Sequence, residues 1–206
     1  MQTAVHDMTP VVAPRQSFVA RRRTLGSLRF DAIEPAQLRS VLAARIEARE
    51  PTRIASSSLH AQWAGRAWLE PLLAQQELVL PEGSLLTRFL GNECARGQRA
   101  ASFALSLARA QGRRVVCIGA DARVVPWGLQ LRRLHRGLNL VGAFDAGSDL
   151  RDPRGLQRMA TRIQASGAEV VLLRVPHAGM AALAALPHAA LGAPLILSFI
   201  EPARAR

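Results

Sequence analysis

The feature that most constrains the fold is the alternation of short apolar runs with longer helical patterns in the second half of the chain. Four apolar runs are found at 113–119, 138–142, 169–175 and 194–199. Helical patterns separate them, at 123–135, 153–165 and 179–186. Apolar runs without polar alternation are typical of strands buried on both faces of a parallel sheet, and strands that alternate with helices predict right-handed βαβ units. We therefore predict an α/β fold with a Rossmann-like, mostly parallel sheet flanked by helices.

The first half of the chain continues this pattern with weaker signals. Strands are expected at 24–30, 52–57 and 77–80, and helices at 35–50 and 59–76. Residues 1–23 end in the run Arg21-Arg22-Arg23, carry Pro10 and Pro14, and show no sustained periodicity, so a mobile basic tail is expected there. The remainder, 24–206, is expected to form one domain, with 24–111 and 112–200 as its halves. Gly167 is expected to cap the helix at 153–165.

Composition excludes several classes of protein. With 206 residues, 49% of them hydrophobic, the chain is too apolar to be intrinsically disordered. Its two cysteines, Cys94 and Cys117, are too few for a disulfide scaffold or a multi-cysteine zinc protein, and neither a metal nor another cofactor is expected. No apolar run reaches the ~18 residues that span a bilayer, and the N-terminus lacks the pattern of a secretory signal. A cytoplasmic location is expected.

The net charge of +12 indicates an anionic partner. All 27 basic residues are arginine, an excess that coding bias in a GC-rich genome also explains. Nucleic acid is not the expected partner, because the arginines are dispersed and the nine aromatic residues (six Phe and three Trp) are not interleaved with them.

The ends of the expected strands are candidate ligand sites, since open α/β sheets bind ligands beyond the carboxyl ends of their strands. Gly119 ends one strand, and Pro176 and His177 follow another. A glycine there lets a phosphate approach the backbone. A glycine at the end of a strand is equally explained by close packing of the backbone, and His177 is equally explained as a histidine in a solvated loop. A dinucleotide fingerprint and a Walker A motif are both absent from the sequence.

Five segments, with the order of the elements, carry a resemblance to a known family. They are Leu25–Ala32, Ile54–His60, Leu78–Gly83 with its Pro81-Glu82-Gly83, Arg114–Gly119 and Arg136–Gly142. Over about residues 24–200, the chain resembles the WecG/TagA/CpsF family of bacterial glycosyltransferases. The resemblance implies transfer of a hexosamine-type sugar from a UDP donor to a polyprenyl-diphosphate-linked acceptor in surface polysaccharide biosynthesis, on the inner membrane face.

The resemblance also implies which residues carry the chemistry. Glu82 stands where the family has the aspartate of Pro-Asp-Gly, and it is the candidate base that takes the proton of the acceptor hydroxyl. Ser57 stands where the family has an asparagine. The candidate substrate-binding residues are Ser57, His60, Ser84, Arg88, Arg96, Arg99, Gly119, Pro176 and His177, with the arginines neutralising diphosphate.

Because several positions that hold polar residues in the family hold other residues in this chain, two hypotheses stay open. The chain is either a divergent transferase that uses Glu82, or a catalytically degenerate relative that binds a nucleotide-sugar, a lipid phosphate or a partner protein. Contact with the acidic inner membrane surface is expected in the first case. A homo-oligomer and a polysaccharide-assembly partner also stay open.

Overall fold

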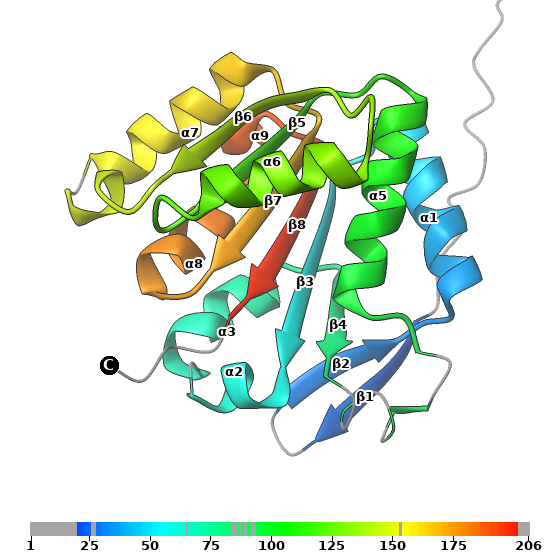
Figure 1. Ribbon diagram of the computed structural model, residues 1–206. Helices are drawn as coiled ribbons and strands as arrows, with labels where there is room; N and C mark the ends of the chain where they lie inside the picture. The colour runs from blue at the N-terminus through cyan, green and yellow to red at the C-terminus, as the bar shows by residue number, and fades with distance from the viewer. Residues whose placement is uncertain are drawn as a thin grey trace, which may run out of the picture.

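The fold is a six-stranded parallel sheet with helices on both faces (Figure 1). The computed structural model describes residues 20–201, except 26, 27, 65, 84, 85, 87, 89, 92, 93 and 153. The strands lie in the order β4-β3-β8-β7-β5-β6, and every neighbouring pair is parallel. Their bounds are β3 Thr52–Ser58, β4 Leu78–Glu82, β5 Val115–Gly119, β6 Leu140–Asp145, β7 Val170–Val175 and β8 Leu195–Ile200. This architecture confirms the predicted α/β, Rossmann-like fold.

The helices divide between the two faces of the sheet (Figure 1). One face is covered by α1 Pro35–Ala48, α5 Gly97–Ala110 and α6 Val124–Leu134. The other is covered by α2 Leu59–Ala64, α3 Arg66–Ala74, α7 Gly155–Ser166, α8 Ala178–Ala184 and α9 His188–Leu191, with the 3₁₀ turn η1 Asp149–Arg151 before α7.

Strand alternation separates the core into two clusters. Val115 and Cys117 of β5 pack with the helices of the first face, whereas Val116 and Ile118 pack with those of the second. All four of these side chains are fully buried. Because β5 is buried on both sides, none of its positions is charged or strongly polar, which is why its apolar run in the sequence predicted a strand.

The region expected to end a tail forms a β-hairpin instead. β1 (Arg21–Leu25) pairs antiparallel with β2 (Leu28–Ala32), so the run Arg21–Arg23 is strand. Buried Asp31 fixes the hairpin to the sheet, because its Oδ2 accepts a hydrogen bond of 2.8 Å from the backbone N–H of Val79 in β4. Arg22 and Arg29 pair with the same carboxylate, at 3.3 and 3.4 Å. Basic residues in this hairpin thus compensate a buried charge.

The largest difference from the predicted elements is α5, which the sequence analysis did not identify. Its buried stripe consists mainly of small residues, and a stripe of alanines contrasts weakly with a polar face. The expected helix at 59–76 is divided into α2 and α3, and β6 runs to Asp145 instead of ending at 142. The expected cap is confirmed: Gly167 has a φ of 59°, and its N–H bonds to the carbonyl of Gln164.

Among the helices that the structure describes, none combines the length and the hydropathy that a membrane crossing requires.

Candidate functional site

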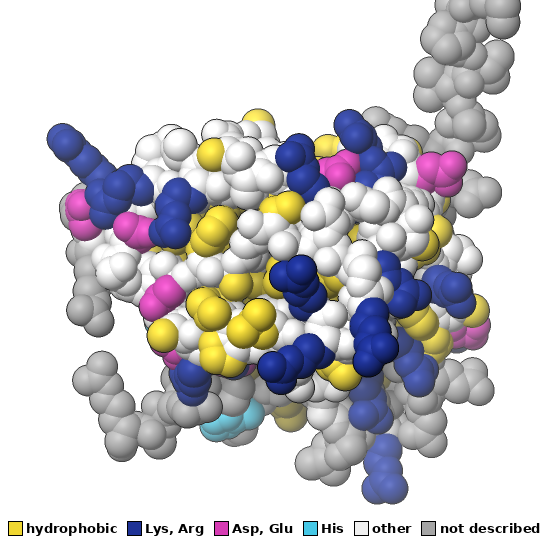
Figure 2. All heavy atoms as spheres, turned by 45° about the horizontal axis from the view of Figure 1, so that its top comes forward, with side chains coloured by type: hydrophobic (Ala, Val, Ile, Leu, Met, Phe, Trp, Pro, Cys, Tyr) yellow, Lys and Arg dark blue, Asp and Glu magenta, His cyan; other side chains and the backbone are white. Residues whose placement is uncertain are grey.

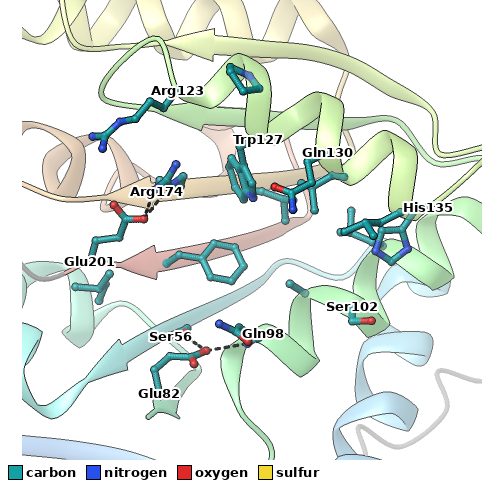
Figure 3. Close-up of a pocket in the computed structure, with 18 of the residues that line it drawn as sticks. Ser56, Glu82, Gln98, Ser102, Arg123, Trp127, Gln130, His135, Arg174 and Glu201 are labelled. Atoms are coloured by element: carbon teal, nitrogen blue, oxygen red, sulfur yellow. Dashed lines mark hydrogen bonds and ion pairs between the residues drawn. The ribbon is translucent and has the colours of Figure 1, made fainter.

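A cavity of about 930 Å³ lies between α5 and α6, over the carboxyl halves of β3, β7 and β8 (Figure 3). Helix α5 contributes Gln98 and Ser102 to its wall, and α6 contributes Trp127 and Gln130. The strands and the loops that follow them contribute the charged groups described below. The sheet therefore presents its carboxyl edge to a space large enough for a small organic ligand.

Glu82 forms the polar floor of this cavity (Figure 3). It is the last residue of β4, and its Oε1 accepts a hydrogen bond of 2.7 Å from the Ser56 hydroxyl. The same oxygen accepts a bond of 2.8 Å from the backbone N–H of Gln98, in the first turn of α5. The first N–H groups of a helix have no partner within the helix, and a carboxylate beside them is stabilised. Glu82 thus both lines the cavity and caps α5.

Gly97 is what allows α5 to begin so close to Glu82. A Cβ at Gly97 would lie 2.0 Å from Oγ of Ser56 and 2.7 Å from Oε1 of Glu82. Both distances are far below van der Waals contact, so the close approach requires glycine.

The three serines at the end of β3 are divided between the faces of the sheet. Ser56 and Ser58 line the cavity, whereas Ser57 between them is fully buried and does not. The Ser57 hydroxyl donates to the carbonyl of Ser58, at 3.2 Å. Oγ of Ser58 accepts a bond of 3.1 Å from the N–H of Ala61 at the start of α2.

The wall of the cavity opposite Glu82 combines aromatic rings with a guanidinium group. The rings of Trp127 on α6 and Phe199 on β8 meet edge to face, with centroids 6.1 Å apart. The Arg174 guanidinium of β7 lies 5.5 Å from the Trp127 ring centroid, a cation–π contact. Nε of Arg174 also donates to Glu201 at 2.8 Å, and both residues line the cavity.

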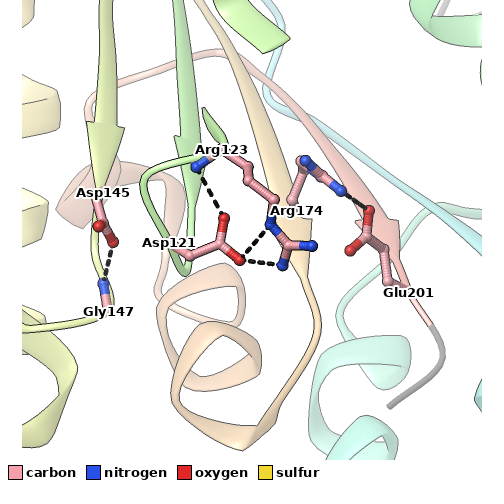
Figure 4. Close-up of polar contacts among 6 residues, drawn as sticks. All are labelled: Asp121, Arg123, Asp145, Gly147, Arg174 and Glu201. Carbon is pink, nitrogen blue, oxygen red and sulfur yellow. Dashed lines mark hydrogen bonds and ion pairs between the residues drawn. The ribbon is translucent and has the colours of Figure 1, made fainter. Parts of the chain in front are cut away.

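A second arginine, Arg123, lies beside this pair (Figure 4). Its Nε donates to Oδ2 of Asp121 at 2.9 Å. The hydrogen bond from the Arg123 side chain holds the pKa of Asp121 below its ordinary value, and the charge of Arg174 contributes to the same shift. Two guanidinium groups and two carboxylates therefore influence one another at the carboxyl edge of β5, β7 and β8.

His135 lies at the other end of the cavity (Figure 3). Burial lowers the pKa of His135, and the charge of Arg109 lowers it further. The imidazole is therefore mainly neutral at pH 7, so that one ring nitrogen can donate and the other can accept a hydrogen bond.

Of the residues that the sequence analysis selected, Glu82 lines the cavity. His60, Arg88, Arg96, Arg99 and His177 are exposed outside it, and Pro176 is half-buried beside His177. Gly119 is buried, where a Cβ would lie 2.9 Å from Cβ of Val124, so it serves the packing of α6 against β5. Ser84 lies outside the described residues.

The sequence analysis did not select the residues that supply most of the cavity's polar groups: Ser56, Ser58, Gln98, Arg123, Arg174 and Glu201. Two signals were present. Strand alternation places Ser56 and Ser58 together on the face opposite Ser57. Arg174 is a charged residue in the otherwise apolar strand Val170–Val175. A charge in such a strand needs a partner or a solvent-filled space.

Within the described ranges, no group of three or more His, Cys, Asp or Glu side chains is arranged to hold a metal ion. Comparison with known proteins does not assign the chain to a family, because no family model matches it and no curated protein matches it significantly.

Proposed function

We propose that the chain binds a UDP-activated hexosamine in the cavity between α5 and α6, and transfers the sugar to a polyprenyl-diphosphate-linked acceptor. The observation that carries this proposal is the position of Glu82, whose carboxylate lies in the wall of the cavity with Oε1 held by two donors. A fixed carboxylate at the edge of a ligand-sized space has the placement that a general base requires.

The proposed reaction divides between the two walls. An acceptor hydroxyl attacks the anomeric carbon and gives its proton to Glu82. The bond between that carbon and the diphosphate breaks, and its electron pair leaves with the UDP oxygen. Arg123 and Arg174 are the cations of the cavity wall that would compensate the charge on the leaving group. The face of an aromatic ring such as Trp127 suits a flat or apolar part of a ligand.

A second candidate function is binding without turnover, and specific contacts favour it. Oε1 of Glu82 already caps α5, and both arginines already pair with carboxylates, Arg123 with Asp121 and Arg174 with Glu201. Groups that have structural partners can hold a ligand without performing chemistry on it. The cavity would then bind a nucleotide-sugar or a lipid phosphate as a binding module.

One variant separates the two candidates. Glu82→Gln keeps an oxygen that accepts the bonds from Ser56 and Gln98 but cannot take a proton at neutral pH. The wild-type chain, Glu82→Gln and the exposed control Glu70→Gln on α3 would each be titrated with UDP and UDP-N-acetylhexosamine. Turnover would be measured with a lipid-linked acceptor. Ligand at a hundred times its dissociation constant should stabilise the fold by about 2.7 kcal/mol, which thermal unfolding detects.

The transferase proposal expects product with the wild type and Glu70→Gln, and unchanged binding without product for Glu82→Gln. Saturable binding without product in all three proteins would establish the second candidate. Turnover that Glu82→Gln leaves undiminished would remove Glu82 from the role of base. Absence of binding at millimolar UDP-sugar would refute both sugar transfer and the binding of a nucleotide-sugar.

A further inference from the structure

Glu201 differs from the other carboxylates near the cavity in what it holds. Oε1 of Glu82, which also lines the cavity, accepts a bond from a backbone N–H and caps α5. Asp121 accepts a bond of 3.0 Å from the backbone N–H of its partner, Arg123. Within the described part of the chain, Glu201 accepts hydrogen bonds only from the side chain of Arg174. Displacing the Glu201 carboxylate would therefore break an ion pair without breaking a helix cap or a turn.

Arg174 has a second contact besides Glu201. Its Nε and Nη2 both donate to Oε1 of Glu201, the first at 2.8 Å. The same guanidinium lies 5.5 Å from the Trp127 ring centroid, in a cation–π contact that does not require the carboxylate. Arg174 is also held within β7, whereas Glu201 follows the end of β8. If the ion pair opens, Glu201 is therefore the group that moves, and Arg174 stays in the wall of the cavity.

The pair between Arg174 and Glu201 is open to exchange with a ligand. Both residues line the cavity, and their side chains are 23% and 35% exposed. Water that reaches an ion pair weakens it, so this pair contributes little to stability. A phosphate group accepts the paired bonds of a guanidinium as a carboxylate does, and it carries at least as much charge. A phosphate that enters the cavity can therefore take the place of the Glu201 carboxylate.

The charge of Glu201 reaches Arg123 as well as Arg174 (Figure 4). The hydrogen bond to Asp121 is the main cause that raises the pKa of Arg123, and the charge of Glu201 contributes to the same shift. Two guanidinium groups that share one carboxylate can instead face two phosphate groups, which is what a diphosphate presents. Arginine side chains are spread over the face of the molecule that Figure 2 shows, so the surface as a whole attracts anions without selecting a position. The cavity supplies a defined position.

We propose that Glu201 stands in for a phosphate group of the ligand at Arg174, and that a diphosphate displaces it on binding. The carboxylate keeps Arg174 paired in the absence of ligand, and it limits the affinity of the cavity for diphosphates. Because a displaced Glu201 stays close to the bound anion, its negative charge also favours release. This inference rests on the proposed function in one respect, the binding of a diphosphate group in the cavity, and it does not require transfer of a sugar.

Isothermal titration calorimetry with inorganic pyrophosphate, at physiological ionic strength and without nucleotide, tests the exchange. Glu201→Gln removes the competing charge and should tighten pyrophosphate binding about fivefold, the factor by which a partly exposed ion pair would oppose binding. Glu201→Ala also removes the acceptor and should tighten binding at least as much. Arg174→Gln should weaken binding at least about tenfold, since a charge-assisted bond is lost. When Glu201→Gln is added to Arg174→Gln, most of the gain should disappear, because it depends on Arg174.

Glu70→Gln on α3 is the matched control. Glu70 is exposed outside the cavity, and its replacement removes the same charge, so binding should stay within about twofold of the wild type. Thermal unfolding checks that every variant is folded. Unchanged or weaker binding in both Glu201 variants would overturn the inference, because Glu201 would then position Arg174 and not compete with the ligand. So would an equal gain in Glu70→Gln, or the absence of pyrophosphate binding in all of these proteins.

The proposed function fails on a different result. Pyrophosphate binding that the Glu201 variants tighten, in a chain that does not bind UDP-N-acetylhexosamine, would refute the sugar donor and support the exchange. Sugar transfer by the wild type, with pyrophosphate binding that the Glu201 variants leave unchanged, would support the transferase and overturn the exchange.

Discussion

Replacing Gly97 with alanine should destabilise the fold, although the same change in most helices is stabilising. In a helix interior, alanine is favoured over glycine by about 1 kcal/mol. At Gly97, however, the new Cβ would lie 2.0 Å from Oγ and 2.1 Å from Cβ of Ser56. Cβ of Ser56 belongs to a central strand and cannot rotate away, so α5 or β3 must move. Overpacking of this kind costs about 1–3 kcal/mol.

The movement should also break the hydrogen bond between Ser56 and Glu82, which is 2.7 Å long and has a charged acceptor. Such bonds contribute about 1.5–3 kcal/mol. Together the two effects exceed the gain in helix propensity, and we expect a net loss of about 2–4 kcal/mol in the free energy of unfolding. In a domain of this size, the thermal midpoint should fall by about 5–15 °C.

Urea and thermal unfolding, followed by circular dichroism, measure this change. Gln98→Ala is the control, because it alters the next residue of α5 but keeps the N–H that Glu82 accepts, and it should stay within about 0.5 kcal/mol of the wild type. Adding Ser56→Gly to Gly97→Ala removes the two closest clashing atoms, Oγ and Cβ of Ser56, so the losses should not add. A midpoint that rises in Gly97→Ala would show that propensity dominates, and would refute the close approach on which this reasoning rests.

Two further predictions concern ionisable groups. Burial raises the pKa of Glu169, but bonds from Arg113 and from the N–H of Arg114, with the charges of Arg113 and Arg49, bring it below its ordinary value. These contacts stabilise the fold above the ordinary carboxyl pKa, and the stabilisation is lost as the pH falls through the lowered one. Glu169→Gln should therefore lower the free energy of unfolding, measured with urea, by up to about 1 kcal/mol at pH 7 and not at all in strong acid. A difference from the wild type that does not change with pH would contradict this prediction. Burial also raises the pKa of the Cys117 thiol to about 12, so a disulfide reagent at pH 8 should modify Cys117 only after unfolding. Rapid modification of Cys117 itself in the native protein would contradict this prediction.

Among the elements that the sequence predicted, β5 and β7 are almost completely buried. β5 and β7 are apolar at almost every position because helices cover both of their faces. Such an apolar run can be recognised in the sequence without knowing which strands lie beside it. Helix α5 is different, since its buried positions are mainly Gly97, Ala100, Ala104 and Ala108. Small residues let a helix approach the sheet closely, but they give little periodic contrast.

The site was harder to predict than the fold, because its residues come together only through strand order. Glu82 ends β4 and Arg174 belongs to β7, and in the sheet only β3 and β8 lie between these strands. Ser56 is opposite Leu80 in the register of β3 with β4, so its side chain shares a face with that of Glu82, whose own partner is Ser58. Sequence alone gives neither this register nor the strand order.

The structure supplies a reason for glutamate at position 82 that does not involve catalysis. Oε1 lies 2.7 Å from Oγ of Ser56 and 2.8 Å from the backbone nitrogen of Gln98, so one oxygen connects β3, β4 and α5. Aspartate is shorter by a methylene, and a displacement of about 1 Å would take both bonds beyond hydrogen-bonding distance. A glutamate that is required as a helix cap would be retained whether or not it also takes a proton. Its presence therefore cannot decide between a transferase and a binding module, whereas Glu82→Gln, which keeps the cap and removes the base, can.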